Sequence, residues 1–157
     1  MLGIDLYKQA VAKLAEADVL GPLRFPANEK DIKFLEALLN VTLPKSYKLM
    51  LQEFGILMFP GQTIYGIGKS GVQTTGGSGV FFQTSVARER GQISQTMVRV
   101  MSSGYGPEFC IECGLINADG EAPVYLVPAD GDMQNATKEA DSFGEFLLKE
   151  VTAVLIE

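Results

Sequence analysis

Two cysteines and a glycine-rich segment are the first residues of this chain whose types and spacing could do chemistry. "CIEC" (110–113) has the C-x-x-C spacing of zinc sites and thiol redox motifs. A tetrahedral zinc site needs four ligands, and the chain has neither a second cysteine pair nor any histidine. In a strand, residues three apart also face opposite sides of the sheet, so the two sulfurs would not converge. The motif therefore predicts two buried free thiols.

The glycine-rich segment raises the possibility of a nucleotide site. "GIGKSG" (66–71) matches G-x-G-x-x-G and nearly completes a P-loop, but Thr63 stands where the first P-loop glycine belongs. Both kinds of site also need a helix that begins at the glycines, so that its N–H groups and dipole meet the phosphates. Here "VQTTGGSG" follows, which does not favour a helix. We interpret residues 61–79 as a flexible surface loop, with nucleotide binding as the alternative.

Histidine is absent from the whole chain. This excludes Ser-His-Asp and Cys-His nucleophile activation, histidine-containing zinc sites and the usual acid–base residue at neutral pH. No spacing of carboxylates singles out a catalytic pair either. We therefore expect a protein that is not an enzyme, with no catalytic residue, cofactor or metal site. An enzyme that uses carboxylates, lysine or a bound metal is the alternative.

Charge is distributed unevenly along the chain. Residues 1–100 carry eleven Lys and Arg against eight Asp and Glu, whereas residues 101–157 carry two against eleven. The last third is therefore the source of the net charge of −6. Such a field repels nucleic acid and attracts basic proteins, whose encounter rates it raises by roughly 10- to 10³-fold at low salt. The same carboxylates could instead form an ordinary solvated surface.

Six carboxylates of this acidic third are our candidate anchors for a basic protein partner, several of them beside turn residues where side chains point into solvent. They are Glu108, Glu112, Asp119, Glu121, Asp130 and Asp132. A nucleic-acid partner is not expected. The helix pair predicted at 29–39 and 44–54 could imitate a helix-turn-helix with Lys45 and Lys48 on phosphates, but a chain of pI 4.7 would repel DNA elsewhere.

Helices come first among the elements that must position these groups. Apolar residues at helical spacing predict amphipathic helices at about 5–17, 29–39 and 44–54. Asn28 is the predicted N-cap of the second helix, and Asn40 its end. Pro44 and Gly55 mark the start and the end of the third.

Strands follow from Gly55 onward, where short segments are rich in β-branched and aromatic residues. Pro60 and Gly61 predict a tight hairpin, and Asp119 and Gly120 a turn between two later strands. Segment 80–90 could be strand or helix, and its arginines before Gly91 favour a helix. The predicted strands are 56–59, 62–67, 97–102, 109–116 and 123–127.

A last helix begins at the S-x-x-E capping box of Ser142 and Glu145. Helices, then hairpin strands, then a helix predict an α+β fold, with an antiparallel β-sheet meander flanked by N-terminal helices and a C-terminal helix. At 157 residues, 46% of them hydrophobic, we expect a single globular domain over 1–157. No apolar stretch approaches the ~18 residues of a membrane helix, and no signal peptide is apparent, so we expect a cytoplasmic location and no membrane partner.

Four stretches together resemble one family. "LPKSYKLMLQEFG" (43–55) resembles the signature of the SMI1/KNR4 (SUKH) family, a short helix before a strand, introduced by Leu-Pro, with Ser-Tyr after it and Phe, Tyr or Asn followed by Gly at its end. "IYGIG" (64–68), "FCIECGLINADGEAPVYLV" (109–127) and "DSFGEFL" (141–147) are similar to the family in the same order. The chain lacks the Trp that many members carry in the sheet, and Glu112 stands where Asp is common.

The resemblance implies an α+β fold and, for bacterial members, a non-catalytic immunity protein that binds and neutralises a toxin domain, often a nuclease. Eukaryotic members are more similar to scaffolding or regulatory proteins. We therefore expect an immunity protein of a toxin–antitoxin type that binds its toxin through the acidic surface. The alternatives are a nucleotide-binding regulator or enzyme that uses loop 61–79, and an intracellular regulatory scaffold.

Overall fold

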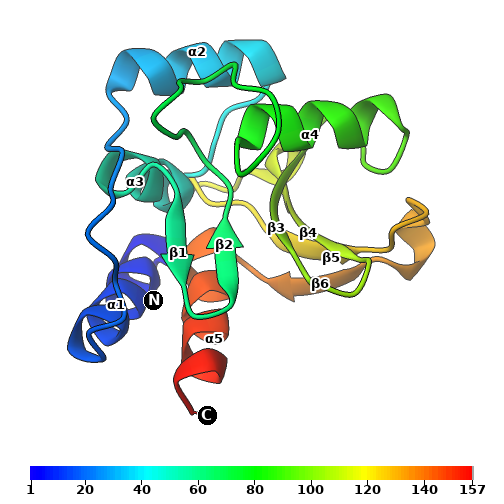
Figure 1. Cartoon of the computed structure of the whole chain (residues 1–157). Coiled ribbons are helices and arrows are strands. Elements are labelled where there is room, and N and C mark those ends of the chain that lie inside the picture. The colour runs from blue at the N-terminus through cyan, green and yellow to red at the C-terminus, as the bar shows by residue number, and fades with distance from the viewer. Residues whose placement is uncertain (157) are drawn as a thin grey trace.

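The computed structural model describes residues 1–156, and within them helices and antiparallel strands form an α+β fold, as predicted. The elements follow the order expected from the sequence, with helices first, strands next and a helix at the end (Figure 1). They are α1 (Gly3–Glu16), α2 (Glu29–Leu39), α3 (Lys45–Glu53), β1 (Leu57–Phe59), β2 (Gln62–Ile64), α4 (Val80–Glu89), β3 (Met97–Ser102), β4 (Glu108–Glu112), the 3₁₀ turn η1 (Cys113–Leu115), β5 (Val124–Val127), the 3₁₀ turn η2 (Met133–Asn135), β6 (Thr137–Ala140) and α5 (Phe143–Ile156).

The larger sheet is an antiparallel meander in which β3, β4, β5 and β6 pair in chain order. The predicted hairpin at 56–67 forms β1 and β2, with Phe59 opposite Gln62. Directly after β2, the N–H of Tyr65 donates to the carbonyl of Val100 at 2.8 Å, which ties the hairpin to β3. The two sheets therefore lie side by side.

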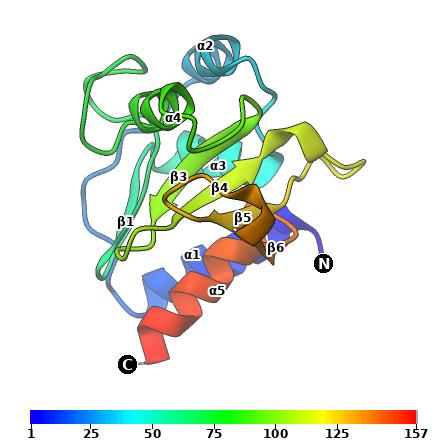
Figure 2. The ribbon, with the colours of Figure 1, turned by 90° about the vertical axis from the view of Figure 1, so that its right-hand side faces the viewer.

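Helices cover both faces of the meander. α5 packs on one face, where the rings of Phe109 and Phe146 lie 4.8 Å apart, and α1 packs on α5. α4 covers the other face at β3, and Figure 2 shows the sheet between α4 and α5. The chain after β5 crosses in front of the sheet in that view.

Several predicted helix ends are confirmed. The side chain of Asn28 accepts the N–H of Asp31 at 2.8 Å, and Asn40 ends α2 in the left-handed conformation with φ 54°. Gly55 follows α3 with φ 73°. Ser142 accepts the N–H of Glu145 at 3.0 Å, which forms one half of the predicted capping box. The other half differs, because the Glu145 carboxylate accepts from Asp141 instead of Ser142.

α3 lies inside the helical layer and contacts α1, α2 and α5. Tyr47 is fully buried, its ring packs edge-on against Phe143 at 5.1 Å, and its hydroxyl donates to the carbonyl of Tyr65 at 2.7 Å. Lys45 is exposed and Lys48 is half-buried. The helix therefore has a packing role.

Three elements differ from the prediction or complete it. The segment 80–90 forms a helix, α4. The strand predicted over 109–116 ends at Glu112, where the chain turns into η1. β6 was not predicted, because "TKEA" is mostly exposed and shows no apolar alternation.

Candidate protein-binding surfaces

The six candidate anchors fall into two groups at opposite ends of β4. Three lie near the start of β4, where Glu108 pairs with Val127 and the chain then enters the loop before β6. Three lie at or beyond its end. A five-residue strand is roughly 15 Å long, so the groups are separated by about that distance. The first group is Glu108, Asp130 and Asp132, and the second is Glu112, Asp119 and Glu121.

Glu108 is already paired with a cation inside the molecule. Its two carboxylate oxygens accept from Nη2 and Nε of Arg99 at 2.7 and 2.9 Å, and the two side chains are only 19% and 16% exposed. Burial raises the pKa of Glu108, while the charge and hydrogen bond of Arg99 lower it. A partner would have to compete with a bidentate arginine for this carboxylate.

Asp130 and Asp132 shape the loop between β5 and β6. Asp130 accepts the N–H of Asp132 at 3.0 Å, and Asp132 in turn accepts the N–H of Gln134 at 3.0 Å and the amide of Asn135 at 2.6 Å. Asp130 is exposed and Asp132 half-buried, and neither forms an ion pair within residues 1–156. Their charges are therefore available to a partner.

Glu121 is buried, with only 3% of its surface exposed, although it follows a turn. Its oxygens accept the hydroxyl and the N–H of Ser46, at 2.7 and 3.0 Å. The same hydroxyl accepts the N–H of Gly144 at 3.0 Å. Gly3 also lies against the carboxylate, so the first turns of α1, α3 and α5 meet at this one side chain. This position gives Glu121 a structural role, because the positive ends of three helices favour a carboxylate there.

Asp119 lies at the surface beside Glu121, at a recess of about 280 Å³. Asp141 and Glu145 line the same recess, together with apolar residues at the start of α1. Asp141 is paired with Lys138, whereas Asp119 has no ion pair within residues 1–156. Glu112 is half-buried at the end of β4, and its Oε1 accepts the N–H of Gly114 at 2.9 Å.

The cysteines are free and buried, as predicted. Cys113 belongs to the main core between the sheet and the helices, whereas Cys110 packs with Ala87 under α4. The two cysteines therefore belong to different hydrophobic clusters. Burial raises the pKa of each to about 12, so neither is a thiolate near neutral pH.

The glycine-rich segment has a packing role at Gly66. A Cβ there would overlap the carbonyl oxygen of Gly55, so only glycine permits this close approach of two backbones. No helix starts within 66–71, and α4 begins only after Gly79. The recess of about 420 Å³ beside this loop is lined by Gly, Ser, Thr, Gln and Tyr, none of which would neutralise a phosphate.

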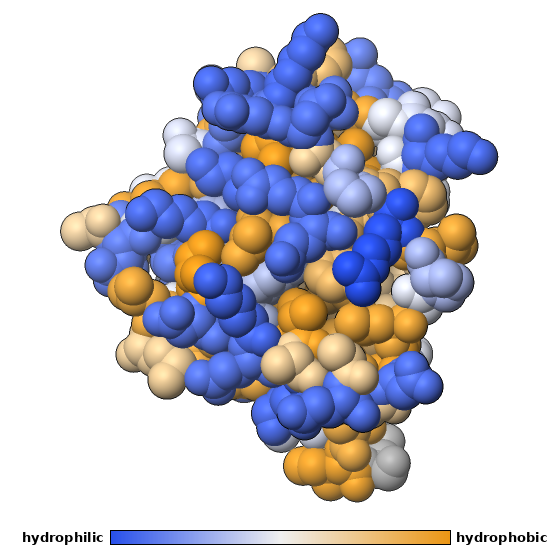
Figure 3. All heavy atoms as spheres, turned by 90° about the vertical axis from the view of Figure 1, so that its left-hand side faces the viewer, coloured by the Kyte–Doolittle hydropathy of each residue, from blue (hydrophilic) through white to orange (hydrophobic). Residues whose placement is uncertain are grey.

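The face made by α1 and the chain leading to α2 mixes hydrophobic and hydrophilic residues at the surface, as Figure 3 shows. Leu23 and Met58 are exposed around a small recess of about 100 Å³ on the outer side of β1.

Together, these features define an α+β protein in which helices enclose an antiparallel meander and carboxylates without an ion pair among residues 1–156 lie at both ends of one strand. A sequence model of the SUKH_6 family, described as SMI1-KNR4 cell-wall, matches residues 29–147. The chain therefore belongs to the SMI1/KNR4 family, as the resemblance indicated. No curated protein matches the chain. Among residues 1–156, no helix could cross a bilayer and no group of His, Cys, Asp and Glu is arranged to hold a metal ion.

Sequence reasoning missed one further feature, an open cleft between α2 and η1. Its walls come from residues 36–42 and from residues 96 and 113–116. Nothing in either segment alone signals a site, because the cleft exists only once the fold brings them together.

Proposed function

We propose that this chain is a non-catalytic immunity protein of the cytoplasm that binds and neutralises a basic toxin domain, of the nuclease type, through its acidic surface. The family supports a protein-binding role. The observation that supports the proposal most directly is that both lysines in residues 101–156 already interact with acceptors of the chain. Lys138 forms an ion pair with Asp141. The Nζ of Lys149 lies 3.9 Å from Oε1 of Glu145 and donates to the carbonyl of Glu139 at 2.8 Å.

Because both lysines are engaged, the charges of the exposed carboxylates are not compensated from within this part of the chain. Glu112, Asp119, Asp130 and Asp132 are the anchors that we retain. Glu108 and Glu121 enter the proposal as structural groups, since Arg99 and Ser46 hold them.

A single partner can reach both ends of β4. Glu108, Cys110 and Glu112 alternate along the strand and share the face on which Cys110 meets α4. α4 covers this face of the sheet at β3. The same face is accessible at β5 and β6, because Tyr125 on β5 is half-exposed and Lys138 on β6 is exposed. An interface of about 800 Å² per partner is roughly 30 Å across, which is more than the length of β4.

The nucleotide-binding alternative has weaker physical support. Phosphates bind where cations or a helix N-terminus compensate their charge, and the recess beside the glycine-rich loop contains no charged side chain. A thermal-shift screen against nucleotides separates the two functions. A ligand at about 100 times its dissociation constant would add ~2.7 kcal/mol to the stability, and we expect no such shift.

Co-expression with the products of the adjacent genes, as candidate toxins, tests the proposal. We expect the wild type to restore growth and to co-purify with the toxin domain. The variant Asp119→Lys, Asp130→Lys, Asp132→Lys should lose both properties, because it reverses the uncompensated charges.

The control carries the same change of net charge at exposed carboxylates elsewhere, Glu16→Lys, Glu29→Lys and Glu89→Lys. It should bind as the wild type does. Equal rescue by both triple variants would refute the acidic anchors, and the lack of any protection by the wild type would refute the immunity function.

A further inference from the structure

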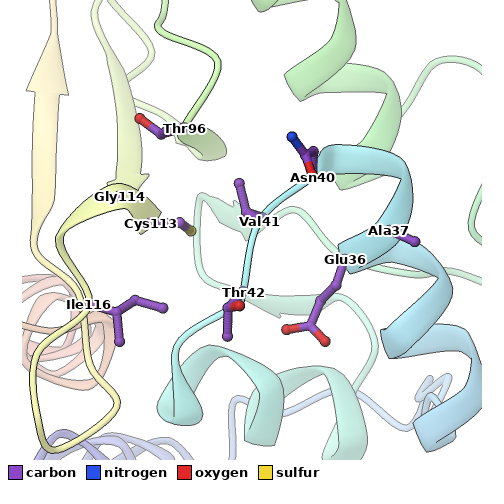
Figure 4. A pocket seen from close by; sticks show the side chains of 9 residues that line it. All are labelled: Glu36, Ala37, Asn40, Val41, Thr42, Thr96, Cys113, Gly114 and Ile116. Carbon is purple, nitrogen blue, oxygen red and sulfur yellow. The ribbon is translucent and has the colours of Figure 1, made fainter.

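The cleft between the C-terminal end of α2 and η1 holds about 680 Å³, which lies in the range of roughly 300–1,000 Å³ typical of binding pockets. Figure 4 shows Glu36 on α2 and Ile116 beyond η1, which project toward Thr42 from opposite sides. Thr42 belongs to the link between α2 and α3, which therefore runs through the cleft. The cleft is open to solvent and lined by both polar and apolar side chains.

Glu36 brings an unpaired carboxylate to this cleft. Its Oε2 accepts the N–H of Leu43 at 2.7 Å, and Oε1 has no side-chain or backbone donor among residues 1–156. Glu112, at the boundary of η1, uses Oε1 for the N–H of Gly114. Neither carboxylate forms an ion pair with the described part of the chain.

The two carboxylates come from opposite sides of the cleft, because Glu36 lines it on α2 and Glu112 directly precedes Cys113, which lines it at η1. The charges of Glu112 and Glu36 add to the rise that burial causes in the pKa of Cys113, which lines the cleft. Arg88 opposes that rise. Its guanidinium is already used, because it donates to the carbonyl of Leu39 at 2.7 Å and to that of Met97 at 3.1 and 3.2 Å.

The backbone contributes the same sign of charge as the carboxylates. α2 ends beside Asn40, which lines the cleft, and the C-terminal end of a helix carries a partial negative charge, which the guanidinium of Arg88 at the carbonyl of Leu39 offsets in part. The hydroxyls of Thr42 and Thr96 add uncharged acceptors. The cleft is therefore suited to a donor-rich cation.

Large apolar side chains stand exposed on both sides of the cleft. Phe34, one turn before Ala37 on α2, is 45% exposed, and Leu115 in η1 is 56% exposed. Ala37 and Ile116, which line the cleft, continue these apolar surfaces inward. Aromatic residues are enriched at protein interfaces, and both side chains offer apolar surface that a partner could bury.

We propose that this cleft receives an arginine side chain of the protein partner, flanked in the partner's sequence by apolar residues that contact Phe34 and Leu115. The proposal rests on the protein-binding function proposed above and names a second contact of the same partner. Arginine fits because its planar guanidinium presents five N–H donors to acceptors that lie on several sides.

Titration of the ¹⁵N-labelled protein with the peptide acetyl-Leu-Arg-Leu-amide tests the cleft without any toxin. We expect saturable shifts of the backbone amides of Ala37, Thr42 and Gly114. The same peptide with citrulline in place of arginine should bind about tenfold more weakly or not at all, because it lacks the charge. Equal binding of both peptides, or shifts that cluster elsewhere, would overturn the proposal.

Two variants change the cleft itself. Glu36→Gln removes the charge but keeps an acceptor for the N–H of Leu43, so the fold is maintained, and binding of the arginine peptide should fall about tenfold. Ala37→Arg places a competing cation at the cleft and should abolish binding. Glu16→Gln and Ala15→Arg are the matched controls at exposed positions of α1, and they should bind as the wild type does.

The outcomes distinguish this inference from the proposed function. If the toxin domain co-purifies equally with wild type, Glu36→Gln and Ala37→Arg, the arginine contact is refuted while the immunity function stands. If the peptide binds as described but the wild type gives no protection against the toxin, the immunity function is refuted and the arginine-binding cleft stands.

Discussion

Glu121 and Ser46 are joined by two hydrogen bonds across 75 residues of sequence, one from the Ser46 N–H at 3.0 Å and one from its hydroxyl at 2.7 Å. Ser46 lies in the first turn of α3, whose N-cap, Pro44, makes no side-chain capping bond. Glu121 therefore replaces a local cap with one supplied by the chain after η1. Because Gly144 donates to the same hydroxyl, this pair also holds the first turn of α5.

Removal of this carboxylate should destabilise the whole helical layer. Glu121→Ala leaves the buried N–H and hydroxyl of Ser46 without an acceptor, and we expect the free energy of unfolding to fall by about 3 kcal/mol. Urea unfolding measures this loss. Asp119→Ala, two residues away and exposed, is the control and should change stability by less than about 0.5 kcal/mol. Similar values for both variants would contradict the structural role of Glu121.

The free energy of unfolding should also depend on pH because of the carboxyl group of Glu121. Burial raises the pKa of Glu121 above its ordinary value of 4.5, although the Ser46 hydrogen bonds and the charge of Lys45 oppose the rise. Since the folded pKa exceeds the unfolded one, the stability from this group is full below the unfolded pKa and declines as pH rises through the folded pKa.

Unfolding free energies of the wild type and Glu121→Gln, measured from about pH 4 to pH 7, isolate this effect because glutamine does not titrate. We expect the stability of the wild type relative to the variant to decrease across this range. A relative stability that increases with pH would show that the three helix N-termini lower the pKa more than burial raises it.

Gly144 should tolerate no side chain, because a Cβ there would overlap the carbonyl oxygen of Gly3 in α1. We expect Gly144→Ala to lower the free energy of unfolding by about 3 kcal/mol, since α1 and α5 would have to move apart. Gly21 has no heavy atom within 4 Å of its Cβ position, so Gly21→Ala should leave stability nearly unchanged. Thermal unfolding of both variants compares the two sites, and an unaffected Gly144→Ala would contradict the close helix packing.

The two cysteines should be inert in the native protein. Burial raises the pKa of Cys110 and of Cys113 to about 12, and both cysteines are buried. We expect iodoacetamide at about pH 8 to modify neither until urea unfolds the chain, because the thiolate is the reactive form. Mass spectrometry follows the modification. Rapid alkylation of the folded protein would revive the redox interpretation of the C-x-x-C motif.

Local signals carried most of the fold prediction. Asn28, Asn40 and Gly55 act within a few residues of themselves, so the helix ends could be located from sequence. β6 gave no such signal, because its pairing with β5 comes from the meander and not from its own polar residues. Only the arginines at its end favoured a helix over a strand for segment 80–90, because the packing of Ala87 of α4 against Cys110 of β4 is a tertiary contact without a local signal.

The candidate site was less accessible to sequence reasoning. The count of carboxylates in the last third is a sequence property, but which of them remain free of intramolecular partners depends on contacts far away in the chain. Arg99 holds Glu108, and Ser46 holds Glu121, whereas Asp130 and Asp132 remain in an exposed loop. Hydrogen bonds across tens of residues leave no periodic trace in a sequence.

The affinity for the toxin domain that we propose as the partner, measured by calorimetry at low and physiological salt, tests the central claim most directly. The variant Asp119→Asn, Asp130→Asn, Asp132→Asn removes three charges but keeps amide oxygens that can accept the loop hydrogen bonds. We expect it to bind about 30-fold more weakly than the wild type at low salt and to lose much of the salt dependence, because each charge contributes about 0.7 kcal/mol. Affinity within about twofold of the wild type, with an unchanged salt dependence, would contradict an interface built on these carboxylates.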